Sequence, residues 1–424
     1  MPVREPRPDA ALGPGGAIEV APLWRHAASQ RLRELAWCSL SPPLLAFLPA
    51  VAAAGGVAGE AAEEAAEGAG GAVPAGMSAN PGGVTHPAID GALNGTTNGT
   101  TNGIAPGLAR WPDGALAGWQ RWLLSADPGA LPPTIAELAA GREHPRPHGA
   151  AHAPSLRLGR HAERLLQFTL EHTPGLELLA ANLPVRRAGA HGVQTLGELD
   201  FVWRDAGSGA IVHWEMAAKF YLLVDPVPEA QRGDAAPPRL HHFVGPNLVD
   251  RLGDKLGHLV HRQLALSHMP EAFALLGRKV DRSEVYLLGW LFYRNGRVPA
   301  GVRDLGIAPD HLHGWWDTLP EWADWAATRA GSRWFRLPRS AWMAPALVPW
   351  AQTEPLATVR DALALRFAET RHDKSWRREA PVMLCELEPA GPLAPGLWRE
   401  RTRGFVVPPG WEERARQRVA RAAE

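Results

Sequence analysis

The chain has 424 residues, with 44 Lys and Arg balanced by 44 Asp and Glu and a pI near 7.3. This length provides an ample core for one large domain or two smaller ones. A net charge of zero excludes a general electrostatic attraction to nucleic acid, so any such affinity must come from local patches. The two cysteines, Cys38 and Cys385, are too few for a disulfide framework or a cysteine-rich zinc site, and they suit a reducing cytoplasm.

The N-terminal part is predicted to contain helices interrupted by a low-complexity segment. Residues 1–48 are expected to form a helical segment without a secretory signal, because no apolar run follows the first charges. The weakly apolar run at 44–58 is shorter than the roughly 20 residues that cross a bilayer, so no membrane partner is expected. Residues 49–106 are rich in Ala and Gly and include NGTTNGTTNG, which predicts a disordered surface insertion. A helical segment and linker are expected at 107–154.

Residues 155–269 are predicted to hold the functional core, which consists of a helix, a β-hairpin and a second helix. The hairpin occupies 196–222 and turns at DAGSG, a sequence typical of hairpin loops. Because side chains alternate along strands, Asp200 lies on the face of the first strand opposite Leu199 and Phe201, and Glu215 and Lys219 share a face of the next. Two nearby carboxylates repel unless a proton or cation intervenes, which favours Mg²⁺ or Mn²⁺. The alternative is an ordinary solvated hairpin face.

A helix precedes the hairpin in sequence and another follows it. In the first, which begins at Leu158, Glu163 lies at the flank of the apolar face. Asn247 is the predicted N-cap of the second, with Asp250 three residues later. Basic residues recur along the second helix at spacings of four, three and four, which suits phosphate binding, with a solvated face as the alternative. They are Arg251, Lys255, His258 and Arg262.

The histidines between His241 and His268 form a rival candidate for a metal site, since zinc binds imidazole. They lack the H-E-x-x-H pattern of zinc enzymes. We therefore interpret His258 and His261 as surface or phosphate-facing residues.

Residues 270–424 are predicted to form a Trp-rich α+β region that packs on the core. Eleven of the 18 tryptophans lie from Trp290 onward, and core packing is their favoured role, with stacking on unpaired bases as the alternative. The unbroken apolar run at 285–293 predicts a strand buried on both faces. Two further strands are predicted at 382–389 and 404–408.

Nine segments together resemble the bacterial family known as domain of unknown function 1853 (DUF1853), over nearly the whole chain apart from the insertion. In chain order they are AWCSLSPPLL, LGRHAE, GELDF, HWEMAAKFYL, FVGPN, HRQLAL, GWW, LPRSAWMAP and GFVVPPGW. That family is itself similar to the PD-(D/E)XK phosphodiesterase superfamily. The resemblance implies an α/β, restriction-endonuclease-like core with a mixed sheet flanked by helices. It also implies roles by position: Glu163 as the helix-borne acid, Asp200 and Glu215 as metal ligands and Lys219 as the catalytic lysine. Gln263 would be an auxiliary polar group that contacts nucleic acid.

One position departs from the superfamily pattern. The lysine usually follows the glutamate by two residues, where this chain has Ala217. Lys219 lies on the same strand face, roughly 6 to 7 Å further along. The expected function is hydrolysis of DNA or RNA, with Mg²⁺ or Mn²⁺ on Asp200 and Glu215 and Lys219 assisting the attacking water.

Two alternatives remain open. A catalytically silent nucleic-acid-binding protein is favoured if Lys219 does not reach the two carboxylates. A structural or adaptor protein is favoured if the Trp-rich region covers the hairpin face. No oligomeric state is predicted.

Overall fold

The computed structural model describes residues 22–49, 106–141, 155–189, 192–227, 237–329, 331–369, 380–391 and 394–420. The predicted insertion, apart from its two ends, and the linker that follows residue 141 lie outside these ranges. Among the described helices, none is long and apolar enough to cross a membrane.

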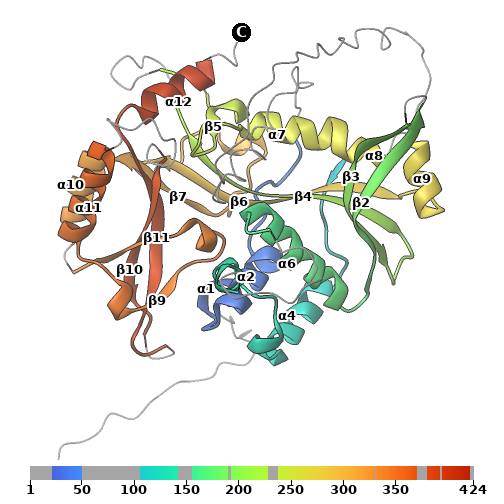
Figure 1. Cartoon of the computed structure of the whole chain (residues 1–424), viewed down its shortest axis with the longest axis horizontal. Helices are drawn as coiled ribbons and strands as arrows, with labels where there is room; N and C mark the ends of the chain where they lie inside the picture. The colour runs from blue at the N-terminus through green and yellow to red at the C-terminus, as the bar shows by residue number, and fades with distance from the viewer. Residues whose placement is uncertain are drawn as a thin grey trace, which may run out of the picture.

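A large mixed β-sheet forms the centre of the molecule (Figure 1). Its strands follow the order β2-β3-β4-β6-β7-β11-β10-β8, with β1, β5 and β9 paired to β6, β4 and β11. The central run from β4 to β11 is parallel, whereas both ends are antiparallel. The strands are β1 (Gly107–Leu108), β2 (Leu176–Gly189), β3 (Gly192–Asp205), β4 (Ile211–Leu223), β5 (Phe243–Val244), β6 (Arg282–Arg294), β7 (His313–Thr318), β8 (Arg333–Arg336), β9 (Leu347–Pro349), β10 (Val382–Pro389) and β11 (Leu397–Val407).

Helices cover both faces of this sheet, which confirms the predicted class of a mixed α/β sheet flanked by helices (Figure 1). One face packs on α2 and α6 and the other on α7, while α10 and α11 pack against the C-terminal strands. The helices are α1 (Leu23–His26), α2 (Gln30–Leu40), α4 (Ala115–Ser125), α5 (Ile135–Ala140), α6 (Leu158–His172), α7 (Leu252–His258), α8 (Leu264–Leu266), α9 (Pro270–Leu276), α10 (Leu319–Ala327), α11 (Leu356–Glu369) and α12 (Trp411–Ala420).

Strand β6 is buried on both faces, as its unbroken apolar run predicts. Tyr286 and Leu288 pack in the core beneath α2 and α6, whereas Val285 and Leu287 pack in the core beneath α7. At Gly289, with φ +150°, an added Cβ would lie 1.8 Å from the Lys219 carbonyl oxygen. Glycine therefore permits the close approach of β4 and β6 at this point.

The sheet runs without a break from the predicted core into the Trp-rich region. Strands β4 and β6 pair in parallel from Val212 opposite Arg282 to Leu222 opposite Phe292. Most of the described tryptophans beyond β6 are buried, although Trp350 is 53% exposed. The Trp-rich region therefore completes the same sheet that carries the hairpin.

Candidate active site

Strands β3 and β4 part at the two carboxylates that the sequence singles out. Their backbone pairing ends at Phe201 opposite Trp214. Beyond this pair β3 stays with β2, while β4 continues along β6. Asp200 and Glu215 are the next residues on each strand, so they face each other across the opening. We call this opening the fork.

Hydrogen bonds hold both carboxylates in place at the fork. The backbone N–H of Met216 donates to Asp200 Oδ2 at 2.9 Å, and that of Asp200 donates to Glu215 Oε1 at 3.3 Å. His213 Nε2 also lies 2.8 Å from Glu215 Oε1. Glu215 is fully buried, and its Oε2 has no hydrogen-bond partner among the described residues. One carboxylate oxygen is therefore left to accept a proton or a cation.

Burial makes it costly for the carboxylates at the fork to carry negative charge. Burial, followed by the charge of Glu215, raises the pKa of Asp200 to about 7. Burial likewise raises the pKa of Glu215 to about 8 and lowers that of His213 to about 4. The imidazole is therefore neutral and shares a hydrogen bond with Glu215 through Nε2.

Glu163 of α6 is the third carboxylate near the fork. Its side chain is 19% exposed, and burial, followed by the charge of Asp200, raises its pKa. Arg160 donates to Glu163 Oε2 at 2.7 Å and to Asn182 Oδ1 of β2 at 2.9 Å. The structure thus brings together the three predicted acids Glu163, Asp200 and Glu215.

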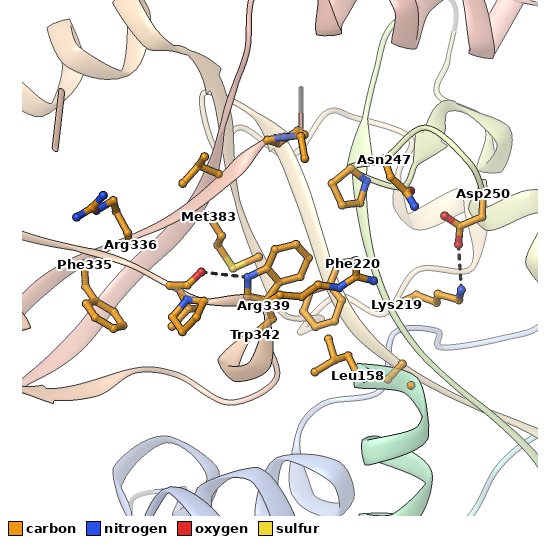
Figure 2. Close-up of a pocket in the computed structure, with 18 of the residues that line it drawn as sticks. Leu158, Lys219, Phe220, Asn247, Asp250, Phe335, Arg336, Arg339, Trp342 and Met383 are labelled. Carbon is orange, nitrogen blue, oxygen red and sulfur yellow. Dashed lines mark hydrogen bonds and ion pairs between the residues drawn. The ribbon is translucent and has the colours of Figure 1, made fainter. Parts of the chain in front are cut away.

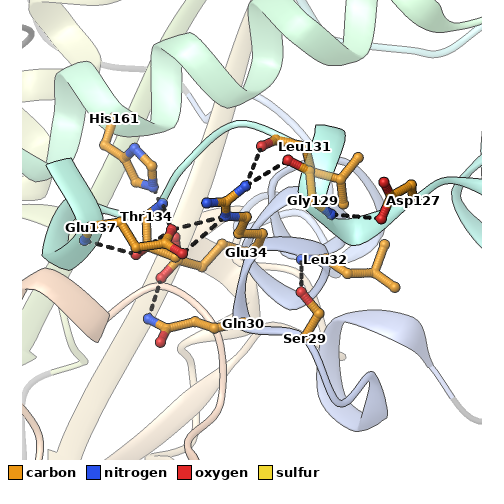
Figure 3. Close-up of polar contacts among 11 residues, drawn as sticks. Ser29, Gln30, Leu32, Glu34, Asp127, Gly129, Leu131, Thr134, Glu137 and His161 are labelled. Atoms are coloured by element: carbon orange, nitrogen blue, oxygen red, sulfur yellow. Dashed lines mark hydrogen bonds and ion pairs between the residues drawn. The ribbon is translucent and has the colours of Figure 1, made fainter. Parts of the chain in front are cut away.

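A buried hydrogen bond fixes the helix that carries Glu163 (Figure 3). His161 Nε2 lies 2.8 Å from Glu34 Oε2 of α2, and both side chains are at most 2% exposed. The Nδ1 atom of His161 faces Arg164 Nη2 at 3.3 Å, so Nδ1 accepts and Nε2 donates to Glu34. This contact sets the position of α6 relative to α2, two residues before Glu163.

The two lysines near the fork have different surroundings. Lys219 Nζ lies 3.0 Å from Asp250 Oδ2, which also accepts a hydrogen bond from the Tyr221 hydroxyl at 3.0 Å. The positive charge of Lys255, on α7, instead lowers the pKa values of both Asp200 and Glu215. The predicted assistance of a water by Lys219 stays a prediction, and Lys255 is the cation that acts on both carboxylates.

A cavity of about 950 Å³ opens beside the fork (Figure 2). Glu163, Lys219 and Lys255 line it, together with Met216 and Ala217, which directly follow Glu215. Asp200 and Glu215 themselves are not in its lining. Its opposite wall comes from β8, the loop after β8, α11 and β10.

The comparison with protein families supports the resemblance seen in the sequence. A family model described as Domain of unknown function (DUF1853) matches residues 33–407. The chain belongs to the DUF1853 family. No curated protein and no solved structure gives a significant match.

One family segment, LPRSAWMAP, forms part of the cavity wall in this DUF1853 protein. Buried Arg403 fixes it by donating to the carbonyl oxygens of Trp342 and Ala344, the latter at 2.9 Å. Arg403 is itself held by Glu400, with 2.6 Å between Nε and Oε1. The wall opposite the fork is therefore anchored to β11.

The basic stripe does not lie on one regular helix, which corrects the sequence prediction. Arg251, and not Asn247, is the N-cap of α7, because the loop before it folds back so that Gly245 N–H bonds to the Asp250 carbonyl. After His258 the chain forms a π-helical turn, Leu259–Gln263, before α8. The altered pitch changes the placement of Arg262 relative to the three basic residues before it.

The five residues predicted to contact nucleic acid are accordingly divided. Arg251 pairs with Asp254 at 2.6 Å, and Lys255 lines the cavity. His258 is half-buried at the end of α7, Arg262 is exposed, and Gln263 has a buried Oε1 without a described partner. Lys255 is the member of this set that the structure brings to the fork.

The histidines of the rival zinc site are not assembled as metal ligands. Within the described ranges, no group of three or more His, Cys, Asp or Glu side chains is arranged to hold a metal ion. His241 Nε2 lies 3.2 Å from Asp254 Oδ1. A Mg²⁺ site makes a smaller demand, since one or two carboxylates with water and substrate oxygens suffice.

Sequence reasoning missed His213 and Tyr221 as members of the site. Both lie an even number of residues from Glu215, so strand alternation places them on its face. The role of Asp250 had no such signal, because its contact with Lys219 depends on the fold of the loop before α7.

Proposed function

We propose that this protein is a metal-dependent phosphodiesterase acting on nucleic acid, with a PD-(D/E)XK-like core formed by α6, β3 and β4. The observation that carries the proposal is the convergence of Glu163, Asp200 and Glu215 at the fork beside a cavity. Raised carboxylate pKa values at a cleft are typical of functional sites. The raised pKa values indicate that the fold buries these carboxylates although burial makes their charged form unfavourable.

The chemistry of the fork fits Mg²⁺ or Mn²⁺. Asp200 and Glu215 would hold the ion, because both are oxygen ligands and Glu215 Oε2 has no described partner. Such an ion would supply positive charge to a phosphodiester and lower the pKa of a bound water. The surrounding groups orient the two carboxylates, since His213 Nε2 is hydrogen-bonded to Glu215 and Met216 N–H donates to Asp200.

We assign the accompanying cation to Lys255 in preference to Lys219. Ala217, where the superfamily has lysine, packs in the same buried cluster as Leu252 and Leu256 of α7. The small alanine lets α7 lie against β4, and this packing brings Lys255 into the cavity beside Ala217. A fixed ammonium there would stabilise the charge that develops on a phosphoryl oxygen.

The test is a nuclease assay with Mg²⁺ and Mn²⁺ on single- and double-stranded DNA and RNA. We expect Asp200→Asn and Glu215→Gln to reduce cleavage by at least about 10²-fold, the scale of losing a charge-stabilising group. Glu177→Gln is the control, since Glu177 is an exposed acid of β2 paired with Arg204. No cleavage by the wild type, or equal cleavage by all four proteins, would refute the proposal.

The lysine assignment needs its own comparison. We expect Lys255→Met to lose about 10² to 10³-fold in cleavage rate, and Lys219→Met to lose less. Lys279→Met, at an exposed loop position, is the control. If Lys219→Met is the more damaging variant, the assignment to Lys255 is wrong.

A second candidate is a catalytically silent nucleic-acid-binding protein. The observation that favours it is the contact of Lys219 with Asp250, at 3.0 Å, combined with Ala217 at the usual lysine position. Binding of oligonucleotides without cleavage under any divalent cation would support this candidate.

A further inference from the structure

The wall of the cavity opposite the fork is basic, and the proposed hydrolysis assigns no role to it. Arg336 of β8, Arg339 of the next loop and Arg366 of α11 line this wall. Burial, followed by the positive charge of Arg336, lowers the pKa of Arg366. Within the described part of this wall, Glu354 is the acidic residue, and it holds Arg336 through two hydrogen bonds of 2.8 and 3.0 Å. We call these three arginines the basic wall.

Charge is distributed unevenly around the cavity. Among the described residues, five cationic side chains line it against three carboxylates, which leaves an excess of two positive charges. At the fork end, the carboxylates of Glu163 and Asp250 are balanced by Lys219 and Lys255. The excess positive charge therefore lies at the basic wall. An anion is attracted to the basic wall even though the whole chain is neutral.

The part of the cavity near the basic wall has an apolar base. Phe220 and Trp342 meet edge to face with ring centroids 5.5 Å apart, and Met383 lies beside them in the lining (Figure 2). Trp342 Nε1 donates to the Leu337 carbonyl at 3.2 Å, and Arg403 holds the Trp342 carbonyl. The loop that carries Arg339 is therefore fixed in the described structure before any ligand arrives.

The volume of the cavity and the chemistry of its lining together indicate which kind of ligand fits there. About 950 Å³ is within the range of pockets that enclose a small molecule, so the cavity suits the end of one strand and not a duplex. A phosphomonoester carries about −1.5 to −2 charge at neutral pH and pairs well with guanidinium groups. An apolar base beside it accommodates the sugar and base that such a phosphate bears.

We infer that the basic wall is a subsite for the terminal phosphomonoester of a single nucleic-acid strand. This inference rests on the proposed function, because the adjoining phosphodiester then lies toward the fork. Arg339 and Arg366 bind the terminal phosphate, and Phe220 and Trp342 support the nucleotide that carries it. The protein therefore selects phosphorylated strand ends.

The test measures binding of the full chain to short oligothymidylates in chelator, where hydrolysis does not interfere. Three probes differ only at the end: 5′-phosphate, 3′-phosphate, or hydroxyl groups at both ends. We expect one phosphorylated probe to bind about tenfold more tightly than the hydroxyl probe, the scale of charge-assisted hydrogen bonds. Arg339→Gln and Arg366→Gln should each remove most of that preference.

The control is Arg360→Gln, because Arg360 is on the same helix as Arg366 but is 53% exposed and pairs with Asp361. It should retain the preference. Equal binding of all three probes by the wild type overturns the inference, as does a preference that survives in both wall variants. A preference without cleavage in Mg²⁺ would defeat the proposed hydrolysis alone, whereas cleavage without a preference would defeat the subsite alone.

Discussion

Two buried acidic sites in this molecule have opposite electrostatics. Glu400 lies on β11 and contacts the buried guanidinium of Arg403 at 2.6 Å. Burial acts to raise the pKa of Glu400, but the charge and hydrogen bonds of Arg403 hold it below its ordinary value. At the fork, burial dominates and the pKa values of Asp200 and Glu215 rise to about 7 and 8. Similar burial is therefore accompanied by opposite shifts in the pKa of the carboxylates at the two sites.

The difference lies in the partner that each fold element supplies. Arg403 is three residues from Glu400 on β11, and the register shift against β10 at Glu386 and Leu387 places both side chains on one side of the strand. From the described residues, the carboxylates at the fork receive the neutral His213, backbone N–H groups and the more distant charge of Lys255. A protein that needed only stability could pair these carboxylates as it pairs Glu400. Their arrangement leaves room for an external cation.

The largest expected effect comes from breaking the satisfied pair. Arg403→Leu leaves Glu400 buried without its cation and should reduce the free energy of unfolding by about 3 to 5 kcal/mol. Urea denaturation measures this loss. The double variant Arg403→Leu/Glu400→Gln should recover part of it, because no buried charge remains. If the single variant is as stable as wild type, the pair does not anchor the cavity wall.

The fork should respond to pH in the opposite direction from Glu400. In metal-free protein the folded-state pKa values of Asp200 and Glu215 lie above their ordinary values of 3.8 and 4.5. The folded state thus keeps protons that the unfolded chain releases, and stability is lost as pH rises from about 4 toward 8. The pKa of Glu400 is lowered, so its contribution to folding stability is instead lost as pH falls.

Chemical denaturation across this pH range measures the fork's contribution as a difference between proteins. Asp317 also has a raised pKa, about 7, so the wild-type slope contains its contribution as well. As pH rises from 5 to about 8, the free energy of unfolding of Asp200→Asn/Glu215→Gln should fall by a few kcal/mol less than that of the wild type. Parallel slopes for the two proteins would mean that the fork carboxylates remain charged throughout.

Much of the fold was predictable because its signals are local. The alternation around Asp200 and Glu215, the DAGSG turn and the apolar run of β6 each lie within one or two strands. Strand β2 was not predicted, because LELLAANLPVRRAG has no strict alternation of apolar and polar residues. The pairing of β2 with β3 is also interrupted by two register shifts. The joining of the hairpin and the Trp-rich region into one sheet is a non-local pairing that no local pattern encodes.

The sequence predicted the residues of the site only where their positions follow from the order and side-chain alternation of regular elements. Glu163, Asp200 and Glu215 could be inferred from their order on successive elements. The different surroundings of Lys219 and Lys255 could not be predicted, because they depend on Asp250, which lies in a loop where Leu248 adopts φ +60°. Such a conformation follows from tertiary contacts, including Trp411 Nε1 donating to the Pro246 carbonyl at 2.8 Å.

A smaller effect is expected from adding Mg²⁺ to the folded protein. Binding at the fork should stabilise it by about 1.4 kcal/mol when free Mg²⁺ exceeds its dissociation constant roughly tenfold. The gain should be greater near pH 8 than near pH 6, because the ion displaces protons from Asp200 and Glu215. Thermal unfolding with and without chelator measures it. A gain that persists in Asp200→Asn/Glu215→Gln would place the ion elsewhere.

The smallest effect should separate the two lysines. The pair of Lys219 and Asp250 is partly buried, with side chains 16% and 18% exposed, and Tyr221 continues to donate to Asp250 when the lysine is removed. Lys219→Met should therefore lose only about 1 kcal/mol of stability and leave the Mg²⁺-dependent gain unchanged. Lys255→Met removes a positive charge that acts on Asp200 and Glu215, so their pKa values should rise further. Its metal-free stability should then decrease more steeply with pH than that of Lys219→Met, and the reverse order would transfer the role at the fork to Lys219.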